Sequence, residues 1–142
     1  MSAGNFTFYN AFKLNLAKAE VDLDTNTFKA VLLTSSYTPN VASQSILSDI
    51  SGNIITDSDY VAQTLGSVTV TESGGTVTFD SADINFGSSV TITAKYLALY
   101  DDTSANDKLV VYVDLDTSGG SVSSTSSTFQ VTINASGIFT LA

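Results

Sequence analysis

The most constraining feature of the sequence is an alternation of apolar and polar residues on both sides of a glycine pair. Val68-Thr69-Val70-Thr71 precedes Ser73-Gly74-Gly75, and Thr76-Val77-Thr78-Phe79 follows it. A period of two places every second side chain on the same face of a strand, and glycine accepts the positive φ angles of a tight hairpin turn. We therefore predict a β-hairpin over residues 68–79. Its packed face carries Val68, Val70, Val77 and Phe79.

Several other segments also have strand patterns. Residues 90–100 and 109–115 are so apolar that they are predicted to form neighbouring central strands buried on both faces, joined by a polar turn at 101–107. Shorter strands are predicted at 28–34, 129–133 and 138–141. The expected fold is therefore mainly β, a single-domain β-sandwich or partly open barrel of about seven to eight short strands.

One segment has helical rather than strand spacing. Phe8, Phe12 and Leu16 recur at every fourth position, which predicts an N-terminal α-helix over residues 7–20. The favoured interpretation is that its apolar stripe closes one end of the β core. Docking of that stripe on a partner is the alternative.

The chain length of 142 residues favours one domain, 1–142, with the β-sandwich spanning 28–142. Two segments interrupt the strand pattern. Residues 35–59 contain the only proline, Pro39, and are predicted to form a long loop with one helical turn. Residues 117–127 are almost wholly Ser, Thr and Gly and are predicted to form a flexible loop.

Composition argues against several functions. The sequence has no His and no Cys, and its formal net charge is −9. Such a charge repels nucleic-acid phosphates, and the missing residue types remove the usual bases, thiolates and zinc ligands. No apolar run approaches the ~20 residues of a membrane-spanning helix. We expect no enzyme activity, catalytic residue, cofactor, nucleic-acid partner or membrane partner.

Two aspartate-rich segments have the oxygen spacing that opens a calcium loop. They begin at Asp22 and Asp114, but their twelfth positions are Leu33 and Thr125, which cannot supply the bidentate glutamate of such a loop. Aspartates that accept hydrogen bonds from their own turn are the favoured interpretation, so no metal ligand is predicted.

The tyrosines allow two interpretations. They can line a carbohydrate platform, which would suit an adhesin that binds host surface glycan, or they can fill a core with the hydroxyl at its rim. The core interpretation is favoured, and the adhesin is kept as the alternative function. The residues concerned are Tyr37, Tyr60, Tyr96, Tyr100 and Tyr112.

Four stretches taken together resemble a family of small virion proteins of tailed bacteriophages, the head decoration or capsid cement proteins. Their order and spacing match over nearly the whole chain. The stretches are Phe12 to Lys18 running into Asp24 to Pro39, then Leu47 to Ile50, then Ala98 to Thr103 with Leu109 to Asp114, and finally Ile133 to Phe139.

The resemblance implies a structural protein without enzymatic activity that binds the outer surface of the assembled capsid and stabilises the head. The implied partner is the major capsid protein, with further contacts between copies of the chain as a homo-oligomer. The implied location is the outer capsid surface of the virion, after synthesis in the host cytoplasm. The alternative function is a tail- or fibre-associated adhesin that binds host surface glycan. Under this hypothesis the N-terminal segment and the long loop make the contact, through Phe6, Phe8, Tyr9, Tyr37, Pro39, Ile46 and Leu47.

Overall fold

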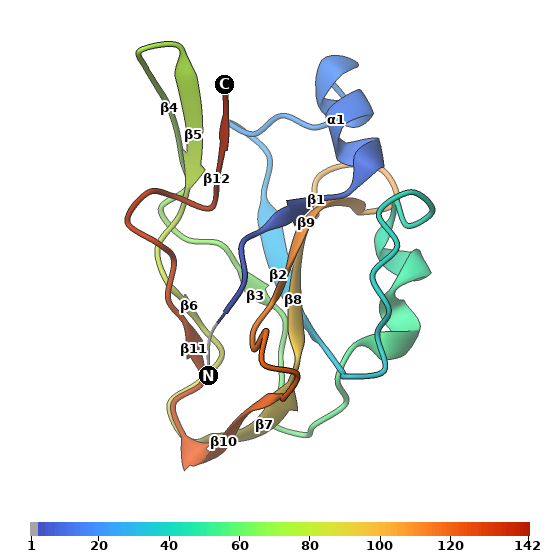
Figure 1. Ribbon diagram of the computed structural model, residues 1–142, viewed down its shortest axis with the longest axis vertical. Coiled ribbons are helices and arrows are strands. Elements are labelled where there is room, and N and C mark those ends of the chain that lie inside the picture. Colours follow the sequence, from blue (N-terminus) through green and yellow to red (C-terminus); the bar gives the residue numbers. More distant parts are fainter. Residues whose placement is uncertain (1–2) are drawn as a thin grey trace.

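The computed structural model describes residues 3–142 and confirms a mainly β fold with one α-helix and no closed barrel (Figure 1). It has 12 strands rather than seven or eight. The predicted strand over 90–100 is divided between two sheets, and four short strands form where none was predicted, at Thr7–Phe8, Gln63–Thr64, Ile84–Asn85 and Val122–Ser127. The elements are β1 (Thr7–Phe8), α1 (Asn10–Ala17), β2 (Phe28–Leu33), η1 (Leu47–Asp49), η2 (Ser51–Asn53), β3 (Gln63–Thr64), β4 (Thr69–Ser73), β5 (Thr76–Asp80), β6 (Ile84–Asn85), β7 (Val90–Ala94), β8 (Tyr96–Asp101), β9 (Lys108–Asp114), β10 (Val122–Ser127), β11 (Gln130–Val131) and β12 (Phe139–Leu141).

The centre of the molecule is a five-stranded antiparallel sheet in the order β1-β9-β8-β2-β3. Strands β8 and β9 are neighbours and are joined by the polar turn, as predicted. Leu97 opposes Val113 in this pair, and Leu32 opposes Leu97 in the pair of β2 with β8. These three side chains are buried, so the most apolar strands occupy the middle of the sheet.

The predicted strand over residues 90–100 is divided at Lys95. Its alternating half, β7, pairs with β10 in a separate two-stranded sheet, while its apolar half, β8, enters the central sheet. The Lys95 ammonium bonds the Asp114 carboxylate at 3.0 Å and the Asp116 carbonyl oxygen at 2.9 Å. These contacts hold the corner where the chain leaves one sheet for the other.

The predicted hairpin is confirmed as β4 and β5. Gly74 and Gly75 have φ angles of 59° and 88°, as a two-residue turn of this kind requires. Val70 opposes Phe79 in the register, which puts both on the expected packed face. The predicted final strand is β12, which pairs with the other edge of β5 to complete a three-stranded sheet.

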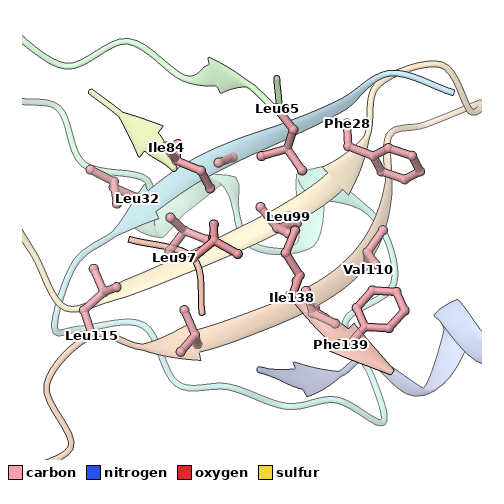
Figure 2. Close-up of a cluster of buried hydrophobic side chains, with 14 of the residues drawn as sticks. Phe28, Leu32, Leu65, Ile84, Leu97, Leu99, Val110, Leu115, Ile138 and Phe139 are labelled. Atoms are coloured by element: carbon pink, nitrogen blue, oxygen red, sulfur yellow. The ribbon is translucent and has the colours of Figure 1, made fainter. Parts of the chain in front are cut away.

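The two faces of the central sheet are covered by different material. One face packs against the smaller sheets and α1 in a phenylalanine-rich and aliphatic core (Figure 2), which we call the phenylalanine face. The other lies beneath the segment 35–62 and carries most of the tyrosines, and we call it the tyrosine face. The alternation along β2 assigns Leu32 to the phenylalanine face, and Val31 and Leu33 to the tyrosine face.

The N-terminal helix is shorter than predicted. Residues 7–8 form β1 against β9 instead of a first helical turn, and α1 spans only Asn10–Ala17. Ala19 has a φ of 58° and lies beyond the helix. The backbone of β1 gains sheet hydrogen bonds that a helix start would leave unmade. Phe12 is fully buried in the core, which supports the favoured role of the helix in closing it.

The long loop 35–59 is confirmed as a segment without regular strands, and η1 and η2 provide its helical turns. The expectation for 117–127 is wrong in its second half, because Val122–Ser127 forms β10. The hydroxyl of Ser124 is buried and donates to the Val90 carbonyl oxygen at 2.7 Å. Pairing with β7 orders a segment that has few apolar groups of its own.

Candidate interaction surface

Phe6 and Phe8 line a groove of about 720 Å³ between the N-terminal segment and residues 131–140. Val113, Leu115 and Ile138 also line it, and all three are buried side chains of the core. Figure 2 shows Leu115 and Ile138 within this core. The groove is therefore an opening in the phenylalanine face, and its apolar side chains are held by packing underneath.

Aromatic contacts close one end of the groove. The ring of Phe8 lies 4.9 Å from that of Phe139, measured between centroids, and 5.6 Å from that of Phe12. These rings link β1, β12 and α1, so the two walls of the groove are connected through their side chains. The wall formed by β1 is thus rigidly supported from the core side.

Ile46 and Leu47 line a second, shallower depression of about 330 Å³, together with residues that include Ser51 and Asp107. Leu47 donates its backbone N–H to the Asp107 carbonyl oxygen at 2.9 Å, which attaches η1 to the turn before β9. The Asp49 carboxylate accepts the backbone N–H groups of Ser45 and Ile46 at 2.8 and 3.1 Å. These donors lower the pKa of Asp49 below its usual value, because they favour the charged form.

The two depressions lie along the same edge of β9. Tyr9 donates its N–H to the Val110 carbonyl oxygen, and further along the edge Ser45 accepts the N–H of Leu109. Ile46 then forms an isolated bridge with Lys108. The N-terminal segment and the start of η1 therefore follow one another along a single strand edge, although about 35 residues separate them in sequence.

Two of the predicted contact residues are placed differently. Tyr9 and Tyr37 are 0% and 2% exposed, so their expected role as contact residues is wrong for the free chain. Their hydroxyls bond each other at 2.7 Å, and Tyr37 donates to Gln44 Oε1 at 2.7 Å. Burial raises the pKa of both tyrosines, because it disfavours the phenolate. They hold the long loop on the sheet. Pro39 is half-buried beside this network and lines neither depression.

Three of the remaining tyrosines belong to the same layer, whereas Tyr60 packs on the phenylalanine face. Tyr100 is buried, and Tyr96 and Tyr112 are half-buried, with ring centroids 6.4 Å apart. Tyr60 is also half-buried and packs its ring on Phe86 at 6.1 Å. The core interpretation of the tyrosines is confirmed, and they do not form the exposed platform that glycan stacking requires.

The aspartate loops are confirmed as turns. The Asp22 carboxylate accepts the N–H groups of Asp24 and Thr25. A hydrogen bond from the Thr25 side chain, together with these backbone donors, lowers the pKa of Asp22. Asp114 pairs with Lys95 and accepts the N–H of Asp116. No group of three or more potential metal-ligating side chains of the His, Cys, Asp or Glu type occurs within residues 3–142.

Sequence reasoning identified one wall of the groove but missed the other. Residues 131–140 were predicted as strand and turn, and the turn residues Asn134, Ser136 and Gly137 also line the groove. The missing signal is the proximity of the N-terminal segment to residues 131–140, which no local pattern encodes.

Comparisons of the chain with protein-family models, curated proteins and solved structures find no match. In the part of the chain that the structure describes, no helix combines the length and the apolarity of a membrane-spanning segment.

Proposed function

We propose that this protein is a non-enzymatic capsid decoration protein that binds the outer surface of the major capsid lattice of a tailed bacteriophage and stabilises the head. The observation that carries the proposal is the placement of two preformed depressions along one edge of β9. Apolar side chains form part of the lining of each depression. A rigid edge of this kind suits attachment to another protein surface, because little conformational entropy is lost when it binds.

The family resemblance supplies the partner, and its segments lie together in space. Phe12 to Lys18 coincides largely with α1, Asp24 to Pro39 contains β2, and Leu47 to Ile50 contains η1. These elements surround β8 and β9, which the resemblance also covers. The resembling stretches therefore describe one structural unit that includes the edge with the two depressions.

Binding to an assembled shell stabilises it by mass action. A ligand at a hundredfold excess over its Kd contributes about 2.7 kcal/mol per site if it binds the shell and not the free subunits. Over many sites this opposes the outward pressure of packaged DNA. The net charge of −9 favours the exterior, because an interior location would place the protein beside the phosphates of the genome. Contacts between neighbouring copies on the lattice are part of the proposal.

The direct test is co-sedimentation of the purified protein with heads that lack it. We expect saturable binding and heads that resist heat better once decorated. Leu47→Asp places a charge in the second depression and is expected to weaken binding at least tenfold. Val61→Asp is the matched control, because Val61 is 65% exposed and lines neither depression.

Failure of the wild-type protein to co-sediment with the heads would overturn the proposal. Equal weakening by both aspartate variants would overturn the assignment of the β9 edge. Competable binding to one sugar class on a glycan array, without binding to heads, would favour an adhesin instead.

A further inference from the structure

The backbone of β1 presents hydrogen-bonding groups to the groove. Thr7 opposes Tyr112, and Tyr9 donates its N–H to the Val110 carbonyl oxygen. Backbone groups of successive residues in a strand point to opposite sides. The N–H and C=O groups of Phe8 therefore point away from β9, toward the side where Phe8 lines the groove. Phe6 lies just before β1 and also lines the groove, and among the described residues its backbone bonds no group of β9.

Another strand edge that pairs with no neighbouring strand, that of β7, is closed to strand addition by two carboxylates. On the side of β7 away from β10, Thr91 donates its N–H to the Asp59 carboxylate at 2.8 Å, and Thr93 donates to Asp57 at 2.9 Å. Carboxylates at an edge prevent the addition of another strand. The β1 edge has no such carboxylate among the residues lining its groove, and it lies beside apolar side chains instead.

The charge around the groove favours a basic partner over a second copy of the chain. None of the side chains that line the groove is charged. Asp83 supports the C-terminal wall by accepting the Ile133 N–H at 2.8 Å, and Asp80 lies beside Gly137 of the same wall. Lys13 is at the β1 end, 5.8 Å from the centroid of the Phe8 ring. A second copy would bring another net charge of −9 to these carboxylates, which disfavours it as the occupant of this groove.

We propose that this groove binds one extended segment of a partner protein, which adds as a strand to the free edge of β1. Apolar side chains at alternate positions of the segment would enter the groove, and lysine or arginine would flank them. The wall from Gly4 to Phe8 accommodates about five residues at about 3.3 Å each. The source of the segment, a capsid protein, rests on the proposed function. The strand addition itself does not depend on it.

The groove is tested first with a synthetic peptide, acetyl-Lys-Val-Thr-Val-Thr-Val-Lys-amide, added to the isotopically labelled full chain. We expect amide shifts concentrated at residues 3–8 and 131–140. A peptide with glutamate in place of both lysines is expected to bind about tenfold more weakly at low salt. A peptide methylated on alternate backbone nitrogens is expected not to bind, because it cannot complete the ladder. Absence of shifts in these two segments at millimolar lysine peptide would overturn the proposal.

A pair of proline variants separates the backbone contact from folding. Phe6→Pro removes an N–H that bonds no group of β9 in the described residues, and proline is tolerated on an edge strand at such a position. Val70→Pro is the matched control on β4, where the register also directs the N–H away from the neighbouring strand. We expect peptide affinity to fall at least tenfold in Phe6→Pro and to stay within twofold in Val70→Pro. Phe6→Ala retains the N–H and reports the contribution of the ring alone.

Undecorated heads then distinguish the two proposals. If the wild-type protein binds heads and Phe6→Pro binds them equally well, the groove is not the capsid contact and the inference about the partner fails. If the labelled chain binds the lysine peptide at the groove but the protein does not bind heads, strand addition stands and the decoration function fails. Parallel loss of peptide and head binding in Phe6→Pro alone supports both.

Discussion

The two faces of the central sheet achieve burial in different ways. The phenylalanine face is covered by elements from the whole length of the chain, and its rings contact one another, as Phe79 does with Phe28 and Phe139 at 5.3 and 5.1 Å. The tyrosine face is covered by one continuous segment, 35–62. That segment is attached by specific hydrogen bonds, including the bond between the hydroxyls of Tyr9 and Tyr37.

This difference separates two sources of stability. Apolar packing is nondirectional and scales with the area removed from water, so the phenylalanine face holds distant segments together without requiring exact partners. A loop has few apolar residues to bury and must satisfy its own backbone. The tyrosine side chains combine an apolar ring with a hydroxyl, and thus allow a polar loop to pack on a buried sheet.

The largest effect is expected from removing a ring of the phenylalanine face. Phe79 is fully buried against two other rings, and Phe79→Ala is expected to lower the free energy of unfolding by about 3–5 kcal/mol. Urea denaturation measures the change. Val61→Ala, at a position 65% exposed, is the control and is expected to shift stability by less than about 0.5 kcal/mol. A loss below about 1 kcal/mol in Phe79→Ala would show that this core is not close-packed.

The tyrosine face is expected to respond to the loss of a single hydroxyl. Tyr37→Phe removes the partner of the buried Tyr9 hydroxyl and is expected to cost about 1–3 kcal/mol. Because Gln44 also accepts the Asn40 N–H at 3.0 Å, it retains one partner in the variant. Combining this substitution with Tyr9→Phe is expected to cost less than the sum of the single changes, since no hydroxyl is then left unpaired. Additive losses in the double-mutant cycle would contradict the proposed coupling.

Alkaline pH is expected to destabilise the tyrosine face selectively. Burial raises the pKa of Tyr9 and Tyr37, and burial together with the nearby Asp102 and Asp107 raises the pKa of Tyr100 to about 12. Below the unfolded pKa of about 10, these tyrosines are neutral in both states and their contribution to the free energy of unfolding is complete. As pH rises above about 10, a tyrosine that ionises only on unfolding lowers the free energy of unfolding by about 1.4 kcal/mol per pH unit.

Urea unfolding between pH 8 and pH 12 tests this expectation, with phenolate absorbance as the probe of ionisation. The double variant with Tyr9→Phe and Tyr37→Phe should show a shallower loss of stability with pH. An equal slope in the wild type and the double variant would show that the decline arises elsewhere.

A smaller effect is expected where η1 begins. Asp49→Asn weakens the acceptor for the N–H groups of Ser45 and Ile46 and is expected to cost about 0.5–1 kcal/mol at neutral pH. Because the folded pKa of Asp49 is lowered, its contribution is present above the unfolded value and disappears as pH falls through the folded value. Asp24→Asn, at an exposed position, is the control. A wild-type advantage that persisted unchanged in strong acid would contradict this account.

Local pattern was sufficient for much of the fold. The alternation around Gly74 and Gly75 predicts the hairpin, since strand period and turn chemistry are properties of neighbouring residues. The continuous apolar runs predict that β8 and β9 are central. The spacing of Asp22 and Asp114 predicts turns, because their carboxylates bond backbone groups only two or three residues away.

Tertiary structure decided the features that depend on distant partners. The turn of the chain at Lys95 depends on Asp114 and Asp116, and β10 is ordered by pairing with β7. Residues 7–8 form a strand because the edge of β9 is available to them. The groove exists because the N-terminal segment and residues 131–140 lie side by side over the core. The sequence by itself determined the hairpin, the central apolar strands and their apolar faces, whereas the remaining strands, the hydrogen-bond partners and the openings between segments follow only from how the packed elements meet.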